Sequence, residues 1–268
     1  MFSAWPEIAG RFSGSRHIVL LTDYDGTLTP IVERPELAVL PERTRELLQR
    51  ISRQRRVTLG IISGRALSDL RQKVGLPHVI YAGNHGLEIE GPDLSFIHPL
   101  AEEFRPMFRL IYQMLSKAFG GSPAVLVEHK GLTLTVHYRL VESDKEVEKV
   151  RGTFNAIVAG ARALGKVKTT SGKKVLEVRP PVDWHKGKAV QLILKKYARG
   201  GNHSGTMVVY LGDDLTDEDA FRFVDKANGI SVFVGEETEA PAAGYYLKSP
   251  AEVQEFLERF AVLDRKDQ

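Results

Sequence analysis

The chain has 268 residues, of which 43% are hydrophobic and 26% charged, and its formal net charge is +3. This composition is typical of a folded globular protein with one large domain, or a core and a smaller domain, and it excludes a long disordered chain. The absence of cysteine excludes disulfides, thiolate metal ligands and a cysteine nucleophile. The small positive excess suits a phosphorylated small molecule better than a nucleic acid.

In the first hundred residues, short apolar runs alternate with helical patterns. The runs at 17–22, 57–62 and 79–82 are predicted to be buried strands, because each is short and rich in branched residues. Two helices are predicted between them, one opened by Pro41 and the other starting after Ile62. Strand, helix, strand, helix, strand is the pattern of a parallel sheet in an α/β protein.

The pattern changes near residue 100. The expected elements are a helix, two strands, a second helix and a hairpin, at 104–115, 125–139, 143–164 and 167–178. Ser143 and Glu146 are predicted to form a capping box for the second helix, whose apolar face runs to Leu164. Residues 170–172 are predicted to turn the hairpin. This order predicts an α+β unit inserted into the first domain.

The α/β pattern returns after residue 181. The expected elements are a helix at 186–197, a strand at 207–211, a short helix capped by Thr216, a strand at 230–234 and a last helix from 250. We therefore expect three segments: a first part of the core at 1–100, the α+β insertion at 101–182, and the second part of the core at 183–268.

Polar clusters follow three of the predicted strands. They are Asp23 with Asp25, Ser63 with Arg65, and Asp213 with Asp214. In an open parallel sheet, ligands bind beyond the carboxyl ends of the strands, so we expect these side chains at one edge. Four carboxylates at one site repel each other unless a cation lies between them. Oxygen ligands favour a hard divalent ion, Mg²⁺ above all.

The spacing of Asp23 and Asp25 suits phosphoryl transfer. Side chains two residues apart in an extended segment face the same centre. One carboxylate can attack phosphorus to form an aspartyl phosphate, and the other can protonate the leaving oxygen and then accept a proton from water. Ser63 offers a hydroxyl to a phosphate oxygen, and Lys186 offers an ammonium group. Asp213 and Asp214, with Asp217 behind them, suit metal binding, and helix capping is the alternative, especially for Asp217 in the first turn of a helix.

Together these segments resemble the four motifs of the haloacid dehalogenase superfamily of phosphohydrolases. The motifs are DYDGTL from Asp23, SGR from Ser63, the lysine at Lys186, and GDD from Gly212. Further stretches bring the resemblance closer to the trehalose-6-phosphate phosphatase family, and they lie at 29–31, 83–86, 137–139, 177–180 and 212–221. The resemblance covers about residues 20–234, which is most of the chain.

The resemblance implies a Rossmann-like core with a parallel sheet and an inserted, mobile α+β cap. It implies a Mg²⁺-dependent hydrolysis of trehalose 6-phosphate, with Asp23 as nucleophile and Asp25 as acid and base. The implied catalytic and metal residues are Asp23, Asp25, Ser63 and Lys186 for catalysis, and Asp23, the Asp25 carbonyl, Asp213 and nearby Asp214 for Mg²⁺. The implied substrate-binding residues are Asp23, Tyr24, Asp25, Ser63, Gly64 and Arg65 in the core, with Glu128, Lys130 and Glu177 in the cap. His129 stands where the family often has Asn, and neither it nor His85 receives a role.

Two other functions stay open on the sequence. Another sugar-phosphate phosphatase, or a phosphomutase of the same superfamily, would share the core motifs, and Arg139 and Arg179 are candidates for a second phosphate. A non-catalytic sugar-phosphate sensor is disfavoured because Asp23 and Asp25 are both present. We expect a cytoplasmic monomer that binds neither nucleic acid nor membrane, because the apolar run at 18–21 is too short for a signal peptide or a membrane span.

Overall fold

The computed structural model describes residues 1–172, 174–198, 205–236 and 242–263. It divides into two compact units, which we call unit 1 and unit 2. Unit 1 combines Met1–Phe96 with Trp184–Gln268, and unit 2 is Ile97–Asp183. Unit 2 is therefore an insertion in the chain of unit 1, and each unit is described by itself.

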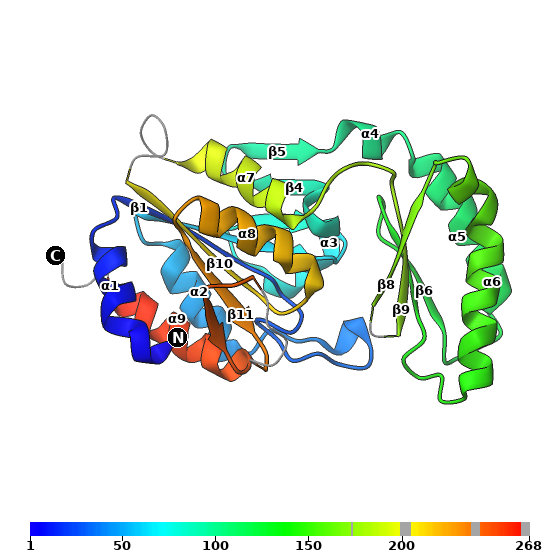
Figure 1. The fold of residues 1–268 in the computed structure, drawn as a ribbon, viewed down its shortest axis with the longest axis horizontal. Coiled ribbons are helices and arrows are strands. Elements are labelled where there is room, and N and C mark those ends of the chain that lie inside the picture. Colours follow the sequence, from blue (N-terminus) through cyan, green and yellow to red (C-terminus); the bar gives the residue numbers. More distant parts are fainter. Residues whose placement is uncertain (173, 199–204, 237–241, 264–268) are drawn as a thin grey trace. The chain divides into compact units, whose positions relative to one another are not determined.

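Unit 1 is built on an eight-stranded sheet with the order β12-β11-β10-β1-β2-β3-β4-β5 (Figure 1). The six strands from β12 to β3 are parallel, and β4 is antiparallel to β3. Their bounds are β1 (His17–Thr22), β2 (Val57–Ile62), β3 (Ile80–Gly83), β4 (Glu88–Gly91), β5 (Leu94–Ile97), β10 (Thr206–Gly212), β11 (Ile230–Val234) and β12 (Tyr245–Leu247). This sheet confirms the predicted α/β fold class.

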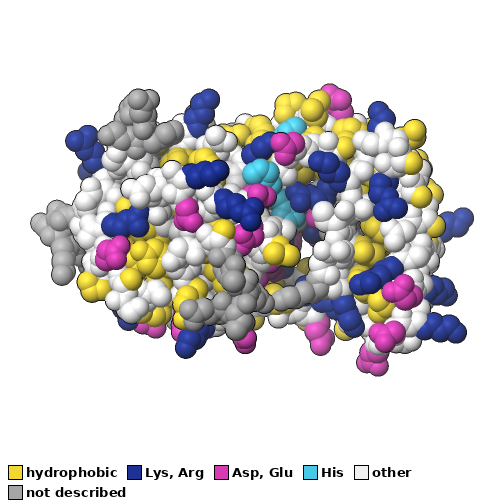
Figure 2. Space-filling model, viewed as in Figure 1, with side chains coloured by type: hydrophobic (Ala, Val, Ile, Leu, Met, Phe, Trp, Pro, Cys, Tyr) yellow, Lys and Arg dark blue, Asp and Glu magenta, His cyan; other side chains and the backbone are white. Residues whose placement is uncertain are grey.

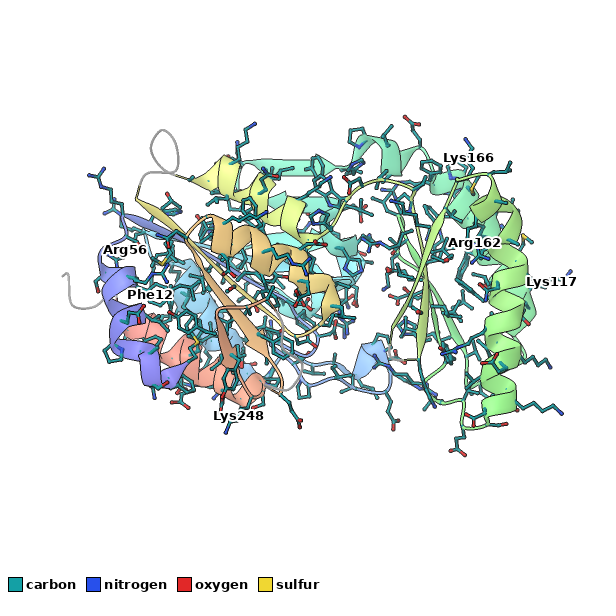
Figure 3. All side chains as sticks on the ribbon, viewed as in Figure 1. Phe12, Arg56, Lys117, Arg162, Lys166 and Lys248 are labelled. Carbon is teal, nitrogen blue, oxygen red and sulfur yellow. The ribbon has the colours of Figure 1, made fainter. Side chains whose placement is uncertain are left out.

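Helices cover both faces of this sheet. They are α1 (Trp5–Ser13), α2 (Glu42–Ser52), α3 (Leu67–Val74), α7 (Lys186–Tyr197), α8 (Glu218–Lys226) and α9 (Pro250–Leu263), with short turns of 3₁₀ helix at η1 (Phe2–Ala4), η2 (Pro35–Leu37), η3 (Asn84–Gly86) and η5 (Leu215–Asp217). Successive β1 side chains face opposite layers: Ile18 packs with α1, α2, α3 and α9, and Val19 with α7 and α8. Phe12 points from α1 into the first layer and meets the ring of Phe260 in α9 (Figure 3). Burial on both faces explains why β1 is one continuous apolar run.

Unit 2 is a four-stranded antiparallel sheet with helices on one face. Its strands, in the order β6-β7-β9-β8, are β6 (Leu126–His129), β7 (Leu134–His137), β9 (Val175–Arg179) and β8 (Lys168–Gly172), and its helices are α4 (Pro99–Glu102), α5 (Arg105–Phe119) and α6 (Asp144–Ala163). Leu134, Val136 and Val178 face α5 and α6 and form a core with Phe108 and Phe154. Because strand side chains alternate, the opposite face is left to the polar residues between them.

Several predicted bounds agree with the structure, and three local predictions in unit 2 are wrong. Ser143 precedes α6, but its side chain makes no capping hydrogen bond. Leu164 is 75% exposed, because α6 ends at Ala163, and Val158 is the last residue of this helix that is fully buried. Residues 170–172 belong to strand β8, whose pairing with β9 continues to Gly172 opposite Val175, so they are not the turn. Residue 173 lies outside the described residues.

Other elements were not predicted from the sequence, namely α1, α4, β4, β5 and β12. Within the described ranges, no helix has both the length and the apolar character needed to cross a membrane. On the face shown in Figure 2, Lys and Arg side chains are scattered among acidic ones, as expected for a chain whose formal net charge is only +3.

Candidate active site

Loops at the carboxyl ends of the adjacent strands β10, β1 and β2 carry the candidate residues. Asp23 follows β1, Ser63 follows β2 and Asp213 follows β10. The Asp23 N–H donates to the Leu211 carbonyl of β10 at 2.8 Å. Gly26 has φ +86°, and a Cβ there would lie 2.0 Å from Asp213 Oδ2. Only glycine therefore permits this approach between the loops after β1 and β10.

Lys186, the first residue of α7, lies buried between two carboxylates. Its Nζ is 3.0 Å from Asp23 Oδ2 and 2.7 Å from Asp217 Oδ1. Burial alone would lower the pKa of this lysine, but Asp217 and Asp23 outweigh burial and hold the pKa well above its ordinary value. Lys186 is therefore a fixed cation beside Asp23.

Asp217 has a larger role than the helix cap predicted from the sequence. Its side chain is fully buried, and its Oδ1 also accepts the Tyr210 hydroxyl at 2.5 Å. Its Oδ2 accepts the N–H groups of Asp213 at 3.1 Å and Asp214 at 3.2 Å. With Lys186, four donors therefore occupy the two oxygens of this carboxylate.

The Asp214 backbone joins this network, but its side chain makes other contacts. It is the N-cap of η5, and its Oδ1 accepts the N–H of Thr216 at 2.8 Å and the hydroxyl of Thr216 at 2.6 Å. The sequence predicted Thr216 as the cap, and the structure shows that Thr216 is the residue being capped. Burial by itself would raise the pKa of Asp214, but Lys186, the Thr216 hydrogen bonds and His85 leave it lowered.

Three carboxylates gather closely enough to hold a divalent metal ion. Asp23, Asp213 and Asp217 each offer an oxygen, and these atoms lie within 4.8 Å of one another. Burial raises the pKa of Asp23 to about 8 and that of Asp213 to about 9; neighbouring carboxylates add to both shifts, while Lys186 opposes them. A cation would relieve this cost, and carboxylate oxygens are the ligands that hard divalent ions prefer. Because Asp217 already has four donors, Asp23 and Asp213 are the better placed ligands.

Asp25 is held by a buried arginine. Arg65 donates from Nε to Asp25 Oδ2 and from Nη2 to Asp25 Oδ1, both at 2.7 Å. The same guanidinium donates from Nη1 to Asp69 at 2.7 Å and from Nη2 to the Pro35 carbonyl at 2.8 Å. Four of its five N–H groups are therefore engaged within unit 1. Arg65 therefore fixes the position of the Asp25 carboxylate.

Tyr24 and Ser63 are also buried. The Tyr24 hydroxyl donates to the Ala38 carbonyl at 3.3 Å, and burial raises its pKa to about 12. The Arg65 guanidinium lies 5.2 Å from the centre of the Tyr24 ring. Ser63 Oγ accepts the Arg65 N–H at 3.2 Å, which leaves the hydroxyl proton for donation to an anion. Tyr24 therefore acts in packing, whereas Ser63 keeps a polar group available.

In unit 2, the three predicted sugar-binding residues share the polar face of the sheet. Pairing between strands aligns Glu128 with Thr135 and Thr135 with Glu177. Glu128 Oε2 is 3.0 Å from His137 Nε2 and 3.7 Å from Lys130 Nζ. Glu177 Oε2 accepts the Thr170 hydroxyl at 3.2 Å and lies 3.9 Å from Arg179 Nε. Such a face offers both donors and acceptors to sugar hydroxyl groups.

His129 belongs to the other face of that sheet. Its ring packs edge-on against Tyr112 of α5, with the ring centres 5.3 Å apart. Its Nδ1 accepts the Gly131 N–H at 3.1 Å, and burial lowers its pKa. His129 is therefore a neutral residue under the sheet, not part of the polar face.

A parallel sheet with helices on both faces is a fold that is also found in solved hydrolases. A haloacid dehalogenase-like hydrolase from Bacteroides thetaiotaomicron has this fold, with a TM-score of 0.61 and 19% identity over 91% of this chain and 98% of its own. The chain belongs to the trehalose-phosphatase family, whose model matches residues 21–251. "Probable trehalose-phosphate phosphatase 4" of Oryza sativa subsp. japonica is 36% identical over 268 residues, which cover 98% of this chain and 71% of that protein. The C-terminal domain of Candida albicans trehalose-6-phosphate phosphatase has a TM-score of 0.79 and 25% identity over 96% of both chains.

The buried position of Lys186 leads to a prediction on stability. Lys186→Met should lower the free energy of unfolding at pH 8 by about 3–5 kcal/mol, because it leaves buried carboxylates without their cation. Urea denaturation followed by circular dichroism measures this change. Lys195→Met, at an exposed position of the same helix, is the control and should change stability little. Equal stability of the two variants would contradict the account of Lys186 given above.

Proposed function

We propose that the protein hydrolyses trehalose 6-phosphate to trehalose and phosphate, with Mg²⁺ and an aspartyl phosphate on Asp23. The observation that carries the proposal is the placement of Asp23 at the end of β1, with Asp213 close by and the buried Lys186 3.0 Å from the Asp23 carboxylate, in a chain of the trehalose-phosphatase family. Phosphoryl transfer asks little covalent chemistry of the protein beyond a nucleophile and an acid, so position and charge decide the rate.

In the first step, a carboxylate oxygen of Asp23 forms a bond to phosphorus while the bond from phosphorus to the sugar oxygen breaks. Asp25 gives its proton to that leaving oxygen. Lys186 is 3.0 Å from Asp23 Oδ2 and stabilises the charge of the phosphoryl oxygens. Ser63 donates its hydroxyl to another phosphoryl oxygen. In the second step, water attacks phosphorus, Asp25 takes the proton, and the bond from Asp23 to phosphorus breaks.

Asp23, Asp213 and the backbone carbonyl of Asp25 are the residues that we propose hold Mg²⁺, with Asp214 nearby. Their fit to such an ion rests on the raised pKa values of Asp23 and Asp213, about 8 and about 9, which burial causes and a cation would offset. When bound, the ion would neutralise phosphate charge and help to orient the phosphate. Arg65 contributes to the reaction by holding the Asp25 carboxylate in place. Gly64 contributes because, without a side chain, it lets the phosphate come close to the backbone.

Unit 2 is proposed to act as the cap that binds the sugar. Its polar face carries Glu128, Lys130 and Glu177, whose hydrogen bonds to His137 and Thr170 fix the two carboxylates in place. Family membership favours hydrolysis over a phosphomutase reaction. Arg179, a candidate for a second phosphate, lies 3.9 Å from the carboxylate of Glu177. A monomeric state and a cytoplasmic location complete the proposal.

The nucleophile can be tested directly. Asp23→Asn should abolish phosphate release from trehalose 6-phosphate, because an amide oxygen is too weak a nucleophile to displace the sugar oxygen. Phosphate release is measured by a coupled assay, and circular dichroism confirms that the variant is folded. Substantial residual turnover in the folded variant would rule Asp23 out as nucleophile.

Removal of the metal ion gives a second test. Chelation by EDTA should remove activity on both trehalose 6-phosphate and p-nitrophenyl phosphate, and added Mg²⁺ should restore it. Ca²⁺ should restore less, because its longer and more variable coordination places the nucleophile less accurately. Initial rates over a titration of each ion measure this difference. Full activity in EDTA would contradict a metal-dependent reaction.

Activity on two substrates distinguishes residues of the cap that bind the sugar from residues of the core that act on the phosphate. Glu128→Ala and Glu177→Ala should each lower kcat/KM for trehalose 6-phosphate by about 10- to 150-fold, the equivalent of about 1.5–3 kcal/mol for a hydrogen bond to a charged group. Activity on p-nitrophenyl phosphate should change only by about 3-fold, because this small substrate makes no sugar contact. Glu148→Ala, at a position 75% exposed on α6, is the control and should affect neither substrate. A parallel loss on both substrates would make the two glutamates structural.

A further inference from the structure

A strained turn follows strand β3. Asn84, His85 and Gly86 form η3, and their φ angles are +50°, +58° and +87°. Residues other than glycine seldom adopt this left-handed region, and a run of two before a glycine is rarer still. Such backbone persists only where its surroundings hold it, and it is common at functional sites. The contacts of this turn therefore indicate which part of the protein the strained backbone supports.

The turn holds the loop that carries Ser63. The His85 N–H donates to the Ser63 carbonyl at 2.9 Å, and the Asn84 N–H donates to the Arg65 carbonyl at 2.8 Å. The His85 ring lies directly on Gly64, since a Cβ at Gly64 would be 2.8 Å from Cε1 and 2.9 Å from Nε2 of the ring. Any side chain at position 64 would displace either the ring or the loop.

The same turn contacts the helix that carries Lys186. Element η3 packs against α7, and Gly86 lies against Ala189, one turn after Lys186. His85 therefore contacts the Ser63 loop, and the turn that carries it contacts α7.

We propose that His85 is a positioning residue that fixes the loop of Ser63 and Gly64 relative to the first turn of α7. This inference rests on the proposed function, in which Ser63 and Lys186 hold the phosphate. The two groups come from different strand ends, and their separation is not set by any covalent neighbour. A buried ring packed on Gly64, on a turn that also contacts α7, sets that separation before the phosphate arrives.

The proposal can be tested with a double-mutant cycle on Gly64 and His85. Gly64→Ala should lower kcat/KM for p-nitrophenyl phosphate by about 100-fold, because a displacement of about 1 Å in a catalytic site has this effect. His85→Asn should keep the backbone, since Asn tolerates a left-handed φ, but it removes the ring and should cost about 10-fold. The double variant should be as active as His85→Asn alone, because the new methyl group no longer meets a ring.

Two further readouts separate positioning from folding. The inhibition constant of inorganic phosphate should rise in Gly64→Ala and in His85→Asn, while the midpoint of thermal unfolding changes little. His78→Asn is the matched control, because His78 is exposed and has φ +61°. It should leave activity and phosphate inhibition unchanged.

The proposal is overturned if the double variant is no more active than Gly64→Ala. It is also overturned if His85→Asn leaves phosphate inhibition unchanged, whether or not it lowers the unfolding midpoint. Both measurements use p-nitrophenyl phosphate and inorganic phosphate. They therefore stand even if the unchanged protein fails to hydrolyse trehalose 6-phosphate, which is the result that would overturn the proposed function.

Discussion

The structure depends on how buried carboxylates are neutralised at the centre of the parallel sheet. Asp23, Asp213 and Asp217 bring oxygens within 4.8 Å of one another, and Asp23 and Asp217 are buried, where water screens charge poorly. Lys186 offsets part of this repulsion from the start of α7, and Tyr210 with two backbone N–H groups occupies the rest of Asp217. The loops after β1 and β10, the glycine at position 26 and the start of α7 together bring these carboxylates close and place a cation beside them. The phosphoryl transfer that we propose for this family member uses the same cluster of negative charge beside one buried lysine.

Much of the fold could be predicted, because a strand that is buried on both faces must be apolar along its whole length. The strands at 17–22, 57–62 and 230–234 and the helix at 186–197 have the bounds that the sequence predicts. Elements at the edges were missed, including β5 and β12, since their side chains are only partly buried and the apolar pattern is weak. The end of α6 was misjudged because Leu164 continues an apolar spacing that the backbone no longer follows.

The candidate site was predictable only as far as residue type and strand ends determine it. Asp23, Asp213 and Lys186 are brought together as the motifs imply. The roles of Asp214 and Asp217 could not be separated, because a spacing of three residues does not reveal which carboxylate turns inward; the 3₁₀ turn at 215–217 decides it. The stretch 83–86 belonged to the family resemblance, but no role for His85 could be assigned, since its importance lies in a left-handed φ and in a contact with Gly64.

The pairing of β1 with β10 has a consequence for how the chain reaches this structure. His17 lies opposite Thr206, so the middle of the sheet joins segments that are separated by all of unit 2. A ribosome must therefore finish the insertion before the first strand can find its neighbour on that side. Unit 2 has its own core and can close early from local contacts, whereas unit 1 must wait for distant ones. Until then β1 is an exposed apolar strand with an open edge, the kind of segment that chaperones bind and that aggregates when they are scarce.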